Sequence, residues 1–228
     1  MEDFKTDLLK CFKQVPVLSK LDPADHNELI ELAQRKQYSK GDFICWQDEL
    51  WPYVAYVTEG HGEWSMLSPE GKRQLVFRLG PCDTIWGHTV FDGCPMPASL
   101  EVMSAMEVYI WHKDVILPII SRHAQAIWDV TEVLVTYMRH VREVGYGFAF
   151  HPVVGRLALL LLNHYQPIEG EPTARDLTLE EIADNIGTTR ELVSRTLHAF
   201  ANEGMIEISR MQFIFTNRDQ LDKVAGKD

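Results

Sequence analysis

The sequence predicts an α+β protein with three consecutive parts: a double-stranded β-roll, a long helix and a small helical domain. Three observations predict this order. Short β-prone runs cut by glycine-containing turns fill residues 36–111, a seven-residue apolar repeat follows, and two short amphipathic helices come near the carboxyl end. We therefore expect a β-roll domain at 1–115, a dimerisation helix and hinge at 116–150, and a domain that contains the two short helices at 151–228.

The β-prone runs have the spacing of an antiparallel roll or barrel. Turn residues such as Gly41, Gly60 and Gly71 stand between them. The first 35 residues are expected to form short helices packed on the roll. The expected strands lie in residues 43–46, 53–58, 75–78 and 100–110.

After the roll, apolar residues recur at the spacing of a coiled-coil seam. Sustained heptads are typical of two-stranded coiled coils, so the pattern predicts a homodimer. One position of the repeat is Ile120, Ile127, Leu134 and Val141, and the other is His123, Val130, Tyr137 and Val144. The expected dimer seam is Ile120, Ile127, Val130, Leu134, Tyr137 and Val141.

A hinge and another helix are expected after the seam. Gly145-Tyr146-Gly147 is expected to end the long helix, because glycine favours helix ends. A new helix is expected to start at His151-Pro152, with an apolar stripe that includes Leu157 and Leu161. Residues 166–175 are interpreted as a loop.

Two capping boxes then delimit a helix-turn-helix. Thr178 with Glu181 predicts one helix start, and Thr188 with Glu191 predicts the next. Gly187 supplies the tight turn between the helices. The apolar positions on either side fit two short helices packed on each other. A strand-like pair at 206–209 and 213–216 adds a hairpin, which makes this a winged helix-turn-helix.

The start of the second helix carries side chains suited to reading DNA. Arg190, Glu191, Ser194 and Arg195 share one solvent-facing surface by helical spacing. Arginine can donate to guanine, glutamate can accept from cytosine, and serine can bond a base edge or a phosphate. The amides of Thr188 and Thr189 suit a phosphate. A simpler interpretation is that Glu191 only caps the helix and pairs with Arg195.

Composition excludes several classes of protein. The net charge of -11 argues against nonspecific coating of nucleic acid or anionic membrane. The apolar run 157–162 is far shorter than the roughly 18 residues of a membrane span. The start Met1-Glu2-Asp3 lacks the basic residues of a signal peptide, so we expect a cytoplasmic protein with no membrane partner. No nucleophile–base pair or phosphate loop stands at working spacing, which argues against an enzyme.

The sequence resembles the family of the cyclic-AMP receptor protein and the fumarate-nitrate reductase regulator (CRP/FNR). The resemblance covers the glycine-punctuated roll, the long helix and above all residues 180–195, Glu-Glu-Ile-Ala-Asp-Asn-Ile-Gly-Thr-Thr-Arg-Glu-Leu-Val-Ser-Arg. It implies a transcription regulator in which the cyclic-nucleotide-binding-like roll at 1–115 is an effector-sensing domain and the winged helix-turn-helix at 151–228 is a DNA-binding domain. By this resemblance Glu191 and Arg195 match base readers, Arg190 a reader or phosphate contact, Ser194 the serine of a Glu-x-x-Ser-Arg pattern, and Thr178 a phosphate contact.

The resemblance also implies the partners. They are double-stranded DNA carrying a two-fold palindrome with half-sites like TTGAT, a second copy of the chain, and RNA polymerase. An effector would repack the helix seam, and the hinge would then reorient the two recognition helices. An alternative is an effector-binding regulatory module, controlled by thiol redox or acting without an effector, that does not read DNA.

The segment 83–99, here called the cassette, departs from the cyclic-nucleotide pattern of the family. That pattern includes an arginine that neutralises the cyclic phosphate, and the cassette contains no arginine. A buried phosphate would then be an unpaired charge, so cyclic AMP is not expected to bind. An iron–sulfur sensor is not expected either, because Cys11 alone lies near the amino terminus.

Three other signals remain open. His88 matches the haem-ligating histidine of the carbon-monoxide-sensing branch, which makes it a candidate iron ligand, although that branch takes its second ligand from a terminal proline where this chain has Glu2. Small aromatic effectors would suit the tryptophans of the roll, which equally fit a core. A thiol switch could use Cys82 or Cys94; otherwise Cys11, Cys45, Cys82 and Cys94 are expected to be buried thiols. The expected effector pocket is Trp86, Gly87, His88, Val90, Phe91, Tyr137 and Met138, and the tryptophans are Trp46, Trp51, Trp64, Trp86 and Trp111.

Overall fold

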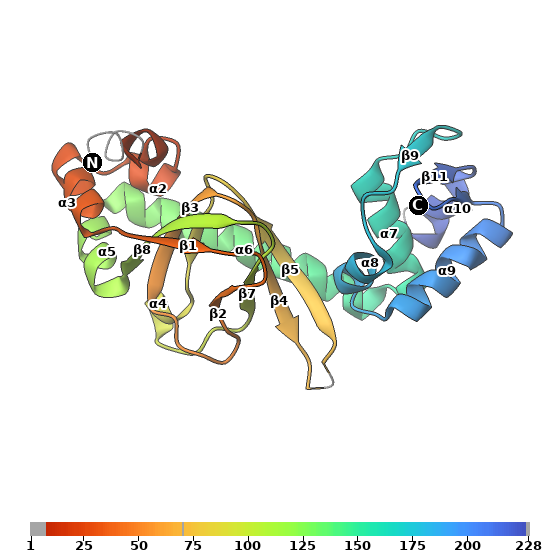
Figure 1. Ribbon diagram of the computed structural model, residues 1–228, viewed down its shortest axis with the longest axis horizontal. Coiled ribbons are helices and arrows are strands. Elements are labelled where there is room, and N and C mark those ends of the chain that lie inside the picture. Colours follow the sequence, from red (N-terminus) through yellow and green to blue (C-terminus); the bar gives the residue numbers. More distant parts are fainter. Residues whose placement is uncertain (1–7, 70, 227–228) are drawn as a thin grey trace. The chain divides into compact units, whose positions relative to one another are not determined.

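The computed structural model describes residues 8–69 and 71–226, which divide into two compact units (Figure 1). The first unit holds the described residues of 1–66 and 76–139, and the second holds those of 67–75 and 140–228. Met1, Glu2 and Asp3, on which two expectations depend, lie outside the described residues. No helix in the described part of the chain is long and apolar enough to cross a membrane.

The first unit is built on two antiparallel four-stranded sheets that form the β-roll, which confirms the predicted α+β class. One sheet has the order β1-β8-β3-β6 and the other β2-β7-β4-β5. The strands are β1 (Gln34–Tyr38), β2 (Phe43–Cys45), β3 (Tyr53–Glu59), β4 (Gly62–Leu67), β5 (Arg73–Leu79), β6 (Thr84–Trp86), β7 (Ser99–Val102) and β8 (Met106–His112).

The expected strand at 100–110 is wrong in one respect, because it is two strands in different sheets. The chain turns between β7 and β8, where the Ser104 hydroxyl accepts a hydrogen bond from the His61 amide (3.0 Å). Strand β1 was not expected, because its residues Gln34 to Lys36 are polar and exposed. It forms because each of its residues pairs with a residue of β8 in antiparallel register.

Short helices close one end of the roll, as predicted. They are α2 (Pro16–Ser19), α3 (Pro23–Leu32) and, after β8, α5 (Lys113–Ile120). Their apolar faces join Trp111 and Tyr56 in one core, and the Trp111 indole donates to the Leu29 carbonyl (2.8 Å). A second core of the roll lies between the two sheets.

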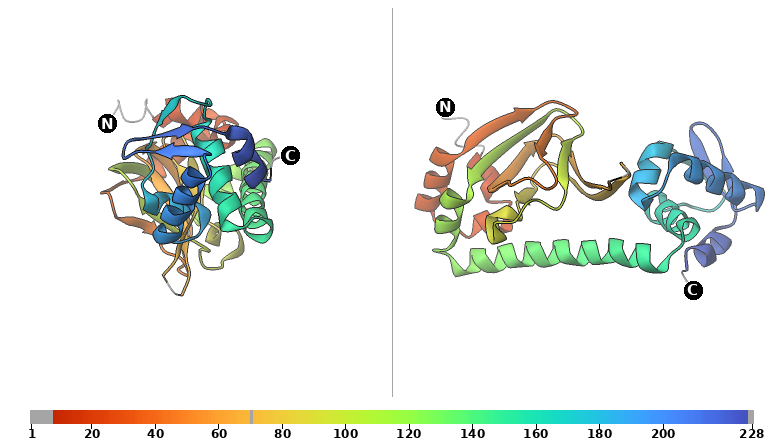
Figure 2. Two further views of the ribbon diagram at one scale, coloured as in Figure 1. Left: turned by 90° about the vertical axis from the view of Figure 1, so that its right-hand side faces the viewer. Right: turned by 90° about the horizontal axis from the view of Figure 1, so that it is seen from below.

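The long helix α6 runs without a break from Ala124 to Phe150, so the predicted end at Gly145-Tyr146-Gly147 is wrong. It ends one residue before His151-Pro152, because a residue that precedes proline is biased away from helical geometry. Figure 2 shows the first part of α6 lying along the roll. There the Tyr137 hydroxyl donates to the Thr84 carbonyl (3.0 Å).

The predicted dimer seam is not one continuous stripe, because its residues lie on different elements and differ in exposure. Ile120 ends α5 and His123 lies in the turn before α6, because Pro118 belongs to a separate helix that stops at Ile120. Val130 is buried and Tyr137 half-buried against the roll. An exposed apolar stripe remains on α6, and it consists of Ile127, Trp128, Leu134, Val135, Met138 and Val141, of which Leu134 is half-buried.

The second unit contains the predicted helix-turn-helix and hairpin. Its core gathers apolar side chains from several helices and from the hairpin, including Leu161, Val193 and Phe213. The expected loop at 166–175 includes strand β9, which completes a sheet of order β10-β11-β9. The elements are α7 (Val153–Tyr165), β9 (Pro172–Ala174), α8 (Leu179–Ile186), α9 (Arg190–Asn202), β10 (Ile206–Ile208), β11 (Gln212–Phe215) and α10 (Arg218–Val224).

Candidate DNA-reading and effector sites

The first capping box forms as predicted at the start of α8. The Thr178 hydroxyl accepts from the Glu181 amide (3.2 Å), and the Glu181 carboxylate accepts from the Thr178 amide (2.7 Å). Gly187 follows the helix with a positive φ of 60°. This backbone conformation favours glycine and produces the sharp turn toward α9.

The predicted second capping box does not form, and the helix starts one residue later than predicted. Thr189, not Thr188, caps α9, with its hydroxyl accepting from the Leu192 amide (3.4 Å). The Thr188 amide donates to the Ala183 carbonyl (3.0 Å), because the glycine turn closes α8 in this way. The Thr188 amide is therefore already used inside the motif, which corrects its predicted role as a phosphate donor.

The predicted reading surface lies on the outer face of α9. Arg190, Glu191 and Arg195 are exposed and Ser194 is half-buried, while the opposite face of the helix is buried in the core of the unit. Its own backbone amide and then the Thr189 hydroxyl hold the pKa of Glu191 below its ordinary value. Among the described residues no close ion pair joins Glu191 to Arg195, although the charges of Arg190 and Arg195 also lower the pKa of Glu191.

Sequence reasoning missed Arg156, which holds the turn of the helix-turn-helix. Its Nε donates to the Ile186 carbonyl (2.9 Å), and its guanidinium also donates to the His151 carbonyl (2.9 Å). The same guanidinium lies over the Phe148 ring at 4.5 Å. Arg156 therefore connects the α8–α9 turn to the last turn of α6. The signal available in the sequence was that Arg156 lies four residues after Pro152, near the start of α7.

The cassette folds into β6, helix α4 (Thr89–Asp92) and the start of β7. Its hydroxyl groups are satisfied within the roll: the Ser99 hydroxyl accepts from the Gln47 amide (2.8 Å), and the Thr89 hydroxyl donates to the Cys94 carbonyl (2.7 Å). Gly87 packs so closely on the roll that an added Cβ would stand 2.7 Å from the Trp51 carbonyl oxygen. These contacts hold the cassette against Gln47 and Trp51 of the roll and against its own backbone.

The expected effector-pocket residues do not share one environment. Trp86 and Val90 are buried in the core, whereas His88, Phe91 and Met138 are exposed. Gly87 lies against Trp51 as described above. Tyr137 packs on Phe77, with ring centroids 5.1 Å apart, and burial raises its pKa to about 12. The apolar side chains expected to form a pocket around His88 are thus mostly buried in the core of the roll.

The tryptophans and cysteines divide by exposure. Trp51, Trp86 and Trp111 are buried, Trp64 is half-buried and Trp46 is exposed, stacked on Phe43. The expectation of buried thiols holds for Cys45, whose pKa burial raises to about 12. It is wrong for Cys82 and Cys94, which are exposed because both lie in turns, and Cys11 is half-buried.

Comparison with known proteins gives matches in both units. Residues 35–123 match the cyclic nucleotide-binding domain and residues 155–224 match the Crp-like helix-turn-helix domain. A CRP-like cAMP-activated global transcriptional regulator of Mycobacterium tuberculosis is 23% identical over 210 residues, which cover 90% of this chain and 94% of that protein. The cyclic AMP receptor protein of Thermus thermophilus is 24% identical over 196 residues, 86% of this chain and 90% of that protein.

Solved structures share the fold. A transcriptional regulator of the CRP/FNR family from Eubacterium rectale superposes with a TM-score of 0.74 at 19% identity, and the match covers 94% of this chain and 99% of that chain.

Proposed function

We propose that this chain, which belongs to the CRP/FNR family of transcription regulators and is not an enzyme, works as a homodimer that reads a two-fold palindromic DNA site. The observation that carries the proposal is the exposed polar surface at the start of α9. In a helix-turn-helix the first residues of the second helix enter the major groove. Two copies related by two-fold symmetry would read two half-sites, for which TTGAT is the expected sequence.

Each side chain of this surface has a proposed task. Arg195 and Glu191 contact base edges, Arg190 contacts a base or phosphate, and Ser194 contacts either. The Thr189 amide and Thr178 would lie beside the phosphate backbone. Because Glu191 faces its own helix start and forms no ion pair with Arg195, both side chains remain available to DNA.

An Arg195→Ala variant tests this assignment. We expect a loss of about 1–3 kcal/mol of binding free energy per half-site, measured by fluorescence anisotropy on a TTGAT palindrome at fixed salt. His198→Ala, one turn further along the same exposed face, is the matched control and should bind as wild type. Equal affinities for Arg195→Ala and wild type would contradict the role of Arg195.

The signal is proposed to be something other than cyclic AMP, although two relatives carry cyclic AMP in their names. The cassette has two aspartates and neither lysine nor arginine, and its hydroxyls are bonded within the roll. An anionic phosphate would find no cation there. Addition of cyclic AMP is expected to leave DNA affinity unchanged, and a tenfold or greater increase would refute this part.

Haem does not fit the residues around His88 as they lie. The imidazole is exposed, but Trp86 and Val90, which were expected to wall the macrocycle, belong to the core. We therefore assign no step to haem. Titration of the anaerobically purified protein with haem and carbon monoxide, beside His88→Ala, decides the matter: a Soret band that changes in the variant would restore His88 as a ligand.

Control of DNA binding is proposed to pass along α6. An effector that binds the two states of the dimer with different affinities would shift their populations. The break at His151-Pro152, fastened by Arg156, is the point at which the recognition helix would be redirected. We also propose that the regulator contacts RNA polymerase and acts in the cytoplasm.

A further inference from the structure

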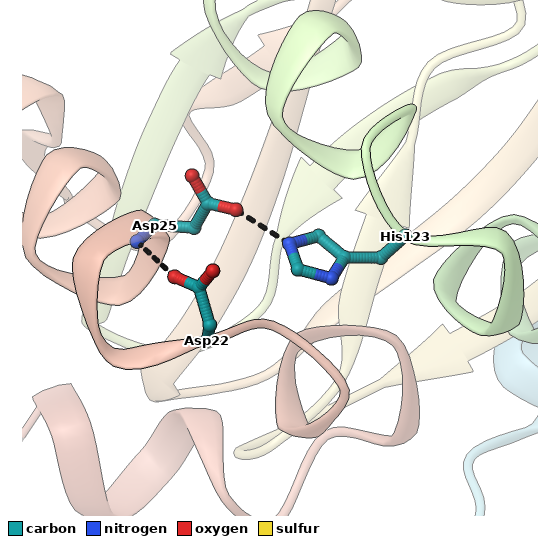
Figure 3. Close-up of side chains that lie close together, drawn as sticks. All are labelled: Asp22, Asp25 and His123. Carbon is teal, nitrogen blue, oxygen red and sulfur yellow. Dashed lines mark hydrogen bonds and ion pairs between the residues drawn. The ribbon is translucent and has the colours of Figure 1, made fainter.

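A cluster of Asp22, Asp25 and His123 shares no residue with either candidate site (Figure 3). Asp22 caps the start of α3, Asp25 stands in its first turn, and His123 immediately precedes α6. Each residue offers one ligand atom, and these atoms lie within 4.8 Å of one another. The close-up shows the three side chains turned toward a common point between the two elements.

We propose that this cluster is a binding site for a divalent transition-metal ion, with Zn²⁺ or Mn²⁺ as the representative ions. The donor set is one imidazole and two carboxylates. Imidazole favours zinc, iron and nickel, and carboxylates favour manganese and magnesium, so the mixed set favours a transition metal over Ca²⁺ or Mg²⁺. Three protein ligands leave further positions for water.

The local charge supports a dication. Asp22, Asp25 and Glu28 are acidic, and Arg122 is the basic group that pairs with them, through Asp25 and through Glu28 at 3.0 Å. With a neutral His123 the group carries two negative charges in excess. Asp25 is 4% exposed, and a carboxylate so far removed from water is stabilised by close positive charge.

The hydrogen bonds around the cluster resemble those that orient metal ligands. Arg122 donates to Oδ1 of Asp25, which leaves Oδ2 facing Nε2 of His123. One oxygen of Asp22 accepts from the Asp25 amide (2.9 Å), and its other oxygen has no partner among the described residues. Ligating carboxylates are commonly held by such outer contacts. The ion would replace the proton shared by His123 and Asp25.

Binding requires small movements and one proton shift. Ligands at about 2.0–2.2 Å from an ion are themselves about 3.0–3.5 Å apart, so Asp22 must approach and the His123–Asp25 contact must widen slightly. The Nε2 of His123 must give up its proton, which leaves the ring protonated at Nδ1. A bound ion would fasten α3 to the first turn of α6, the helix that carries the exposed apolar stripe.

Two substitutions remove single ligands. Asp22→Asn keeps a good helix cap, because asparagine and aspartate cap equally well, and it removes the charge. His123→Gln removes the imidazole. His164→Gln is the matched control, because His164 pairs with Asp176 elsewhere on the surface and so tests any histidine that binds metal adventitiously.

The experiment is calorimetric titration of the full chain, first dialysed against a chelator, with Zn²⁺ and with Mn²⁺, and with Mg²⁺ for comparison. We expect one saturable transition-metal site per chain, weakened at least about tenfold in Asp22→Asn and His123→Gln and unchanged in His164→Gln. The ion should raise the thermal midpoint of wild type and not that of Asp22→Asn. Absence of a saturable site in wild type, or equal binding by wild type and His123→Gln, would overturn the proposal.

Discussion

The exposed apolar stripe of α6 gives a quantitative test of dimerisation. We expect the double substitution Met138→Glu with Val141→Glu to convert the proposed dimer to monomer, because both apolar side chains are exposed on α6 and can be covered by a partner. Met138 is 71% exposed and Val141 50% exposed in the single chain. Glutamate keeps the helix propensity of the segment while placing charge on the proposed interface.

The size of the effect follows from those exposures. Burying a whole methionine or valine side chain contributes about 1.5–3 kcal/mol. The portion left for a partner to cover therefore amounts to about 2–3.5 kcal/mol per chain, or about 4–7 kcal/mol in a two-fold dimer that uses each residue twice. At 1.4 kcal/mol per factor of ten, the dimer dissociation constant should rise about a thousandfold to a hundred-thousandfold.

Sedimentation velocity over a range of concentrations measures this change, and anisotropy on the palindrome should show the matching loss of DNA affinity. Thr136→Glu provides the control, because Thr136 is exposed on the opposite side of α6 and bonds back to the Glu132 carbonyl. That variant should sediment as wild type. A Met138→Glu, Val141→Glu protein that remains dimeric at the same concentrations would show that the stripe is not the interface.

Three further outcomes follow from the first unit. Iodoacetamide at pH 8 should alkylate Cys82 quickly and leave Cys45 unmodified, because burial raises the pKa of Cys45 to about 12; mass spectrometry of peptides locates the label. The hydrogen bond from His123, together with Arg122, holds the pKa of Asp25 below its ordinary 3.8, so its stabilisation is complete above that pH and is lost as pH falls through the lowered value. Urea unfolding in chelator should therefore depend less on pH below 4 in Asp25→Asn than in wild type. Gly87→Ala should destabilise the roll by about 1–3 kcal/mol, since its Cβ would crowd the Trp51 backbone, and an unchanged urea midpoint would contradict this packing.

The sequence was most informative where local chemistry decides structure. The Thr178–Glu181 box and Gly187 predicted the helix-turn-helix, because capping and positive φ depend on neighbouring residues alone. The start of α9 was displaced by one residue, since Thr188 and Thr189 are equivalent caps by sequence. The glycine turn engages the Thr188 amide and so selects Thr189.

Long-range packing limited the remaining predictions. The heptad spacing marked some apolar positions of α6, such as Ile127 and Val130, but spacing does not say whether Val130 faces a partner or its own roll. Glycine pairs often end helices, yet Gly145 and Gly147 lie inside α6, because nothing breaks its hydrogen bonding before Pro152. Likewise, Trp86 next to His88 suggested a pocket wall, and only the three-dimensional structure places it in the core.

The net charge of -11 constrains how such a protein can bind DNA. In a dimer the charge doubles, and the phosphate backbone repels it at separations up to the Debye length of about 8 Å. Nonspecific affinity, which comes almost entirely from phosphate neutralisation, must then be low. Binding should then depend on the few short-range contacts proposed for the start of α9. For this reason the loss of Arg195 alone should remove a large share of operator affinity, and affinity should fall less steeply with salt than it does for a basic repressor.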